Sequence, residues 1–272
     1  PWPKQQPRAT ERLRRGPDRR LARNSYFKAN RIVRFSFWAR CSCSTVQVNS
    51  DDREQYGDTF ADVYDDWYAE VSDVDALVMM IGNLVGGSLR DMSILECGVG
   101  TGRVAFKLAD AGAKVTGIDN SEAMLDQLRK NDPAGRIDLV LGDMSSEIPV
   151  GEHDVAVVAF NTLFNLQHQT DQASFFRHVA TRLRAGGLLV IEANEFRAVE
   201  LVELEETRSD RGGRVVISTS RLDPTTQTAS GIFTELSDSG EIVRPWSIRY
   251  APTTEIDSMA TAAGLELIHR AE

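Results

Sequence analysis

The 272-residue sequence contains little cysteine, and this shortage excludes several kinds of site. The three cysteines are Cys41, Cys43 and Cys97, and the Cys41-Ser42-Cys43 stretch lacks the second pair of ligands that a zinc site needs. Nothing in this pattern demands a disulfide, so we expect a cytoplasmic protein without a bound metal. No run of about 18 apolar residues occurs, which predicts no membrane-spanning helix.

Basic residues are scarce outside the first fifty positions. Residues 1–50 hold 12 Lys and Arg against 2 Asp and Glu, whereas residues 51–272 hold 19 basic and 38 acidic residues. An acidic body of this size is a poor partner for nucleic acid or an anionic membrane, and we expect neither. Hydrophobic residues make up 42% of the chain, which is enough for a sizeable core.

The first fifty residues lack methionine and show little hydrophobic periodicity. Methionine first occurs at Met79, while Val46 and Val48 lie where a bacterial start codon read from a valine codon would stand. We interpret residues 1–50 as a disordered or non-native basic extension, with the natural start near residue 47. The alternatives are a basic arm for nucleic acid and an arginine-rich transit peptide.

A glycine-rich turn between a strand and a helix organises the rest of the sequence. Apolar residues 92–95 predict a buried strand, which Glu96 closes. The glycines follow at alternate positions: Gly98, Gly100 and Gly102. A helical pattern resumes at Arg103, so the turn lets backbone approach a ligand in front of unpaired helix N–H groups. Arg103 also stands where a dinucleotide-binding G-x-G-x-x-G motif requires its third glycine, which argues against that motif.

An acidic residue closes the next predicted strand. Residues 114–118 predict this strand, and Asp119 follows it, 17 residues after Gly102. Because neighbouring parallel strands end side by side, the Asp119 carboxylate suits the paired hydroxyls of a ribose. Residues 138–141 predict a third strand, and residues 154–160 predict a fourth that is buried on both faces.

Counted as E-x-G-x-G-x-G, residues 96–102 resemble motif I of class I S-adenosylmethionine-dependent methyltransferases. The resemblance covers residues 58–270 and points to bacterial small-molecule members of the glycine and amino-sugar N-methyltransferase kind. It implies an α/β fold with a Rossmann-like doubly wound sheet, S-adenosyl-L-methionine as cofactor and a small-molecule methyl acceptor. It also implies a set of cofactor-binding residues: Tyr64, Tyr68, Glu96, Gly98, Val99, Gly100, Gly102, Arg103, Asp119, Asn120, Met124, Gly142, Asp143, Met144 and Phe160.

Aromatic residues precede the glycine turn at Phe60, Tyr64, Trp67 and Tyr68, spaced as one face of a helix. Periodicity alone equally allows an ordinary core stripe. The resemblance implies instead a lid helix over the cofactor, in which a tyrosine, Tyr64 or Tyr68, contacts the methionine end. Arg103 and Tyr64 would then face the cofactor carboxylate.

The adenine end of the cofactor has its own implied residues. The Asp143 side chain would accept from the adenine amino group, and the Met144 amide would donate to the ring. The residues alone also allow a plain turn at Gly142-Asp143 and a buried core position for Met124. Ser121 is well placed as the N-cap of the helix that carries Met124.

The acceptor side is expected where the fourth strand ends. Asn161 and Asn165 are candidates for holding polar substrate atoms, with turn caps as the alternative. His168 is the candidate general base for a hydroxyl acceptor, although a solvent-exposed loop histidine is the common alternative. The Asn/Asp-Pro-Pro-Tyr/Phe motif of nucleobase amine methylation is absent from this stretch, and so are the clustered carboxylates of a catechol-type magnesium site.

Three alternating stretches follow Glu192 and predict antiparallel strands, at residues 213–222, 231–236 and 241–251. In related amino-sugar and amino-acid enzymes such an insertion shapes the substrate pocket, and in some it supports a homodimer. The chain therefore divides into a basic extension (1–50), lid helices (51–90), a cofactor-binding core (91–195), an antiparallel substrate-side insertion (196–252) and a last helix with the sixth strand (253–272).

The sequence stops at Glu272, with no residues left for the seventh strand of the resembled fold, which lies between the fifth and sixth. We expect this strand to be missing through truncation, the alternatives being a partner or local sequence that fills the gap. The expected reaction is in-line methyl transfer to a nitrogen or oxygen of a small molecule. Two alternative functions are cofactor binding without turnover and, with less support, nucleic-acid methylation.

Overall fold

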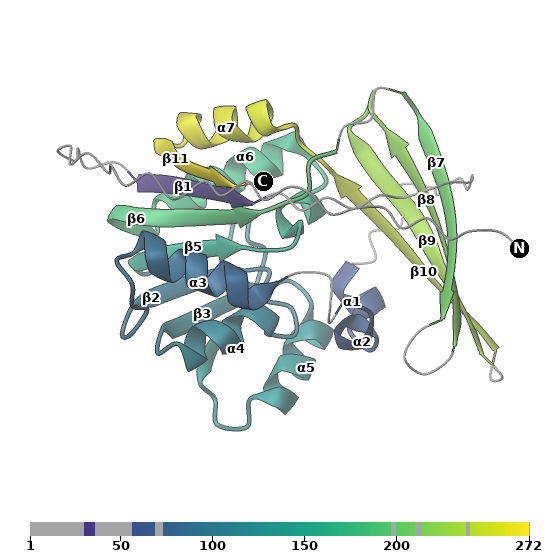
Figure 1. Ribbon diagram of the computed structural model, residues 1–272, viewed down its shortest axis with the longest axis horizontal. Coiled ribbons are helices and arrows are strands. Elements are labelled where there is room, and N and C mark those ends of the chain that lie inside the picture. Colours follow the sequence, from purple (N-terminus) through teal and green to yellow (C-terminus); the bar gives the residue numbers. More distant parts are fainter. Residues whose placement is uncertain are drawn as a thin grey trace, which may run out of the picture.

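The chain forms two β-sheets, one surrounded by helices and one standing beside it (Figure 1). The computed structural model describes residues 56–68, 73–196, 200–209, 214–237 and 240–271, together with the backbone of residues 30–35. The basic extension expected over residues 1–50 lies outside the described residues, apart from residues 30–35.

The larger sheet has seven strands in the order β11-β1-β6-β5-β2-β3-β4, and all neighbours run parallel. Its strands are β1 (Asn30–Phe35), β2 (Ser93–Cys97), β3 (Lys114–Asp119), β4 (Ile137–Leu141), β5 (His153–Val158), β6 (Leu183–Glu192) and β11 (Leu265–Ala271). The chain order reverses between β2 and β5, so ligands are expected beyond the carboxyl ends of these strands. This arrangement confirms the doubly wound α/β fold.

The prediction that the seventh strand of the sheet is missing is wrong. The place between β6 and β11 is occupied by β1, which pairs in parallel with both neighbours. Residues Arg31 and Phe35 of β1 lie opposite Leu188 and Glu192 of β6. A distant segment of the same chain therefore fills the gap, because both flanking strands offer unpaired backbone groups that a third strand satisfies.

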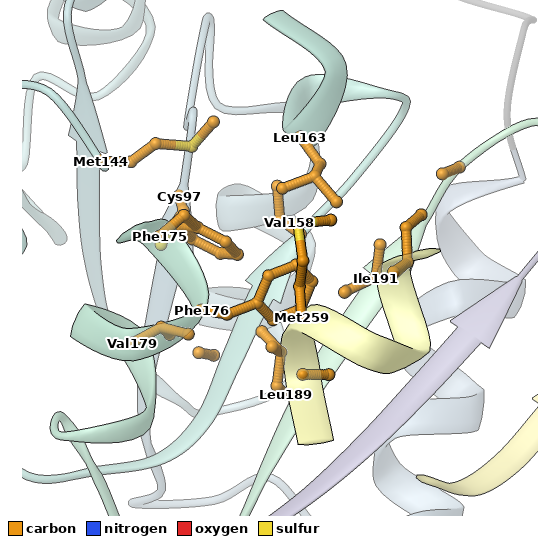
Figure 2. Packing of buried hydrophobic residues seen from close by; sticks show 14 of the residues in the cluster. Cys97, Met144, Val158, Leu163, Phe175, Phe176, Val179, Leu189, Ile191 and Met259 are labelled. Atoms are coloured by element: carbon orange, nitrogen blue, oxygen red, sulfur yellow. The ribbon is translucent and has the colours of Figure 1, made fainter. Parts of the chain in front are cut away.

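Helices cover both faces of this sheet: α3 (Val74–Leu84), α4 (Arg103–Asp110), α5 (Glu122–Asn131), α6 (Gln169–Ala180) and α7 (Thr253–Ala262). Alternation along the strands divides the core, since Ile94 packs with α3, α4 and α5, whereas Leu95 packs with α6 and α7. Figure 2 shows Phe176 of α6 beside Met259 of α7, and Phe175 of the same helix beside Cys97, all in one buried cluster. Helix α6 ends at Ala180, shortly before β6 begins at Leu183.

The smaller sheet is antiparallel, in the order β10-β9-β8-β7. Its strands are β7 (Val202–Ser209), β8 (Val215–Asp223), β9 (Thr228–Ser237) and β10 (Gly240–Arg249). The last three match the alternating stretches of the sequence, whereas β7 was not predicted.

Two short helices, α1 (Tyr56–Phe60) and α2 (Tyr64–Tyr68), lie between the two sheets (Figure 1). The single helix that the aromatic spacing predicts is wrong, because a turn at residues 61–63 separates α1 from α2. Phe60 and Trp67 are buried in a cluster with Phe233 of β9, while Tyr64 and Tyr68 are half-buried. We call residues 56–68 the lid.

Candidate active site

The glycine turn joins β2 to α4 in a left-handed backbone conformation. Gly98, Gly100 and Gly102 have φ values of +70°, +55° and +91°, which side-chain-bearing residues adopt at a cost. A Cβ atom on Gly98 would stand 2.1 Å from Cγ2 of Thr162, so the turn also passes too close to the end of β5 for any side chain. Glycine is therefore required at position 98 both by the left-handed backbone and by the close approach of Thr162.

Asp119 lies across this turn, at the end of β3. Its Oδ2 accepts a hydrogen bond from the Gly100 N–H at 2.8 Å, and its Oδ1 accepts from the Ser121 N–H at 2.9 Å. Burial raises the pKa of Asp119, while these backbone donors oppose the shift. The structure thus brings the predicted ribose-binding carboxylate to the predicted glycine turn.

Glu96 of β2 is a buried carboxylate beside the same turn, with 3% of its surface exposed. Burial raises its pKa well above the ordinary value, while the Arg103 charge and the Ala105 N–H act in the opposite direction. Its Oε2 is buried and has no hydrogen-bond partner among the described residues. A buried acceptor without a donor suits a ligand that brings one, such as the amino group of a methionine moiety.

An open recess of about 380 Å³ lies next to Asp119, at the ends of β3 and β4. Its lining is Asn120, Leu141, Gly142, Asp143 and Glu147. The Asp143 N–H donates to Glu147 Oε2 at 2.8 Å, and Asp143 Oδ1 accepts from the Ser145 N–H at 2.7 Å. Glu147 was not predicted, since nothing in its local sequence distinguishes it from a surface acid.

The two methionines predicted at the adenine end are both buried. Met144 packs in the core shared with α6, and Met124 packs in the lid cluster with Phe60 and Trp67. The helix carrying Met124 is capped as expected, since Ser121 Oγ accepts from the Met124 N–H at 3.1 Å. The structure thus places the Met124 side chain against the lid.

The lid tyrosines lie against the end of β5. The rings of Tyr64 and Tyr68 are 4.9 Å apart, and Tyr68 meets Phe160 edge-on at 5.7 Å. Arg103 lies with its guanidinium carbon 5.3 Å from the Phe160 ring centre and donates to the Tyr68 carbonyl at 2.8 Å. Burial raises the pKa of both Tyr56 and Tyr64, which keeps these phenols protonated.

The turn after β5 is strained in the same region. Phe160 and Asn161 have φ values of +48° and +61°, a conformation that persists only where the surroundings enforce it. Glu192, at the end of β6, accepts from the Phe160 N–H at 3.0 Å, and Asn161 Oδ1 accepts from the Asn194 N–H at 2.6 Å. Burial raises the pKa of Glu192, which the sequence analysis named only as the residue before the alternating stretches.

Of the three residues predicted to be catalytic, only Asn161 lies in the strained turn. His168 precedes α6 and Asn165 ends the 3₁₀ turn η1 (Thr162–Asn165), and both side chains are exposed. The Asn161 side chain supports the strained turn. Arg249 of β10 forms a buried network with Gln172, Gln227 and Glu255.

Comparison with known proteins identifies the family. Residues 94–187 match the model of a methyltransferase domain. The structure of the CcbJ methyltransferase from Streptomyces caelestis is 35% identical, with a TM-score of 0.63, covering 80% of this chain and 89% of that one. This chain is a class I S-adenosylmethionine-dependent methyltransferase.

Two further proteins are similar to this chain. The cypemycin N-terminal methyltransferase of a Streptomyces species is 28% identical over 219 residues, which is 79% of this methyltransferase and 89% of the relative. The amino pentose methyltransferase CalS10 of Micromonospora echinaspora, solved with S-adenosylmethionine bound, shares the fold at 21% identity and a TM-score of 0.62, covering 74% and 88% of the two chains.

The residues of this methyltransferase fit S-adenosylmethionine. The Asp119 carboxylate lies beside the left-handed turn, and Glu96 Oε2 is buried without a partner among the described residues. Acceptors of this kind are what the amino and hydroxyl groups of the cofactor require. Among the described residues no group of three His, Cys, Asp or Glu side chains could hold a metal ion. Within that same part of the chain, every helix is too short or too polar to cross a membrane.

Proposed function

We propose that this methyltransferase methylates the neutral nitrogen of a small-molecule amine. The observation that carries the proposal is the chemistry of the side chains around the strained turn, where aromatic rings and protonated phenols predominate. S-adenosylmethionine supplies a methyl group activated by a sulfonium, a cation that aromatic faces favour. Tyr64, Tyr68 and Phe160 would orient the acceptor and exclude water.

The absence of a suitable histidine base supports a nitrogen acceptor. All four histidines lie among the described residues. His153 begins β5 at the opposite edge of the sheet, His178 bonds within α6, His269 lies on β11 and His168 is exposed. A neutral amine needs no base during the transfer, because it attacks through a free lone pair and loses its proton afterwards.

The proposed roles of the cofactor-binding residues follow the resemblance. Asp119 would accept from the ribose hydroxyls, Glu96 from the amino group and Asp143 from the adenine amino group. Arg103 would pair with the cofactor carboxylate. The N-terminal methyltransferase relative acts, by its name, on an amino terminus, which is consistent with an amine acceptor.

O-methylation is the second candidate, and Glu192 is the observation that favours it. A carboxylate whose pKa is raised by burial is closer to the ideal for a general base near neutral pH. Glu192 would then accept the proton of a hydroxyl acceptor beside Phe160.

The experiment is label transfer from methyl-tritiated S-adenosylmethionine to matched pairs of amines and alcohols, with product structures from mass spectrometry. We expect label on nitrogen, with a rate that rises with pH until the free amine is neutral. Label on oxygen when the acceptor has no amine would contradict the proposal. An Asp119→Ala variant serves as the blank.

A further inference from the structure

The lid is fastened to the cofactor half of the molecule by three polar contacts. Ser121 Oγ donates to Asp58 at 2.5 Å, and Thr101 Oγ1 donates to Asp65 at 2.5 Å. Arg103 adds its bond to the Tyr68 carbonyl. These contacts place α1 and α2 directly over the glycine turn and the start of α5.

A fourth attachment comes from the antiparallel sheet. Arg244 of β10 is buried, with 6% of its side chain exposed, and its guanidinium reaches the turn between α1 and α2. Nη1 donates to the Thr59 carbonyl at 2.5 Å and to Asp62 Oδ1 at 2.7 Å, while Nη2 donates to Asp62 Oδ2 at 2.8 Å. The guanidinium carbon also lies 5.8 Å from the Trp67 ring centre. This bidentate pairing fixes the orientation of the two side chains and also neutralises the arginine charge.

A second carboxylate faces the same guanidinium. Glu235 of β9 is 2% exposed, and its Oε1 accepts from Arg214 at 2.8 Å. Its Oε2 lies 3.5 Å from Arg244 Nη2 but has no hydrogen-bond partner among the described residues. Arg244 therefore has a counterion within its own sheet, so release of Asp62 would not leave a buried charge alone.

We infer that Arg244 is a positioning residue that latches the lid, with Asp62 as its partner in the closed state and Glu235 as its partner when the lid is released. The latch couples the antiparallel sheet, on the proposed acceptor side, to the tyrosines that lie over the glycine turn. Arg244 acts through the lid, without itself touching the glycine turn. The contact can open reversibly because 61% of the Asp62 side chain is exposed, so water can solvate its carboxylate when the lid is released.

The test compares Asp62→Asn with Asp66→Asn in the full chain. Both substitutions remove one exposed carboxylate from the lid, but Asp66 lies outside the Arg244 contact. The readouts are the calorimetric affinity for S-adenosylmethionine and amide hydrogen exchange of residues 56–68. Loss of a charge-assisted pair predicts about tenfold weaker binding and faster lid exchange for Asp62→Asn. Asp66→Asn should match the wild type in both readouts.

A conservative variant and a double variant separate latching from general stability. Asp62→Glu keeps the carboxylate and should restore most of the affinity. Arg244→Lys removes the bidentate hydrogen bonds to Asp62. Adding Asp62→Asn to this variant should weaken cofactor binding no further, because both changes remove the same contact. Additive losses, equal effects from Asp66→Asn, unchanged lid exchange in Asp62→Asn, or faster exchange spread over β2 and β3 would each overturn the inference. If Arg244→Lys does not fold, the three single-residue Asp variants decide the result.

Discussion

The Asp119 carboxylate accepts a hydrogen bond of 2.8 Å from the backbone N–H of Gly100, so the end of β3 is tied to the glycine turn that follows β2. The two residues are 19 positions apart in the chain. They meet because β2 and β3 are parallel neighbours that end at the same edge.

Asp119→Asn should weaken S-adenosylmethionine binding by about 100-fold, because the amide loses charge and turns a donor toward groups that themselves donate. Isothermal calorimetry measures the affinity. Asp138→Asn, an exposed change on neighbouring β4, is the matched control and should bind as the wild type does. Unchanged affinity in a folded Asp119→Asn protein would contradict the assigned role.

Gly98→Ala should destabilise the fold by about 3 kcal/mol, combining a left-handed backbone cost with the overlap at Thr162. Gly86→Ala separates the two costs, since its φ of +101° is also left-handed but nothing lies within 4 Å of the added Cβ. Thr162→Ser removes the overlapping methyl group and should partly rescue Gly98→Ala. Urea unfolding measures all three, and a failure of rescue would argue against the steric reason.

Glu192→Gln should reduce methyl transfer to an amine by less than about fivefold, because the amide oxygen still accepts from the Phe160 N–H. A general base would instead lose several hundredfold and change its pH profile. Steady-state rates between pH 6 and 9 distinguish these outcomes. His168→Ala should leave the rate unchanged if the acceptor is an amine.

His153, a pH-sensitive group, lies at the amino-terminal end of β5. Desolvation lowers its pKa, with Asp154 raising it and Arg182 lowering it, and its Nδ1 lies 3.0 Å from Ser93 Oγ. Because the unfolded state binds the proton more readily, the His153 contribution to stability is present above the unfolded pKa of about 6.5. It is lost as the pH falls through that value toward the lower folded pKa.

The free energy of unfolding should therefore fall more steeply between pH 7.5 and 5.5 in the wild type than in His153→Asn. Asparagine keeps a polar atom near the position of Nδ1 but does not titrate. Urea titrations at the two pH values give the comparison. Equal slopes for the two proteins would show that His153 does not drive the pH dependence.

Deletion of residues 1–47 should lower stability or cause association, because it removes β1 and leaves the facing edges of β6 and β11 unpaired. Deletion of residues 1–29 keeps β1 and is the matched control. Urea midpoints and size-exclusion chromatography report the two effects. A fully stable monomer without residues 1–47 would mean that β1 is dispensable.

The sequence alone was sufficient for the local parts of this protein. The Glu96–Gly102 spacing and the acidic strand ends predicted the family and the cofactor, and the alternating stretches predicted three of the antiparallel strands, because each depends on short-range patterns. The aromatic spacing failed at Phe60 and Tyr64, since periodicity does not show a turn that breaks a helix in two.

The tertiary structure alone decided which distant residues cooperate. Glu192 supports Phe160 from another strand, and Arg244 reaches Asp62 across 182 positions of the chain. The seventh place in the sheet likewise went to residues 30–35, far from the strands that they join. Such contacts depend on how the layers of the fold pack together. The residue type alone does not show whether an arginine is buried or which distant carboxylate it meets.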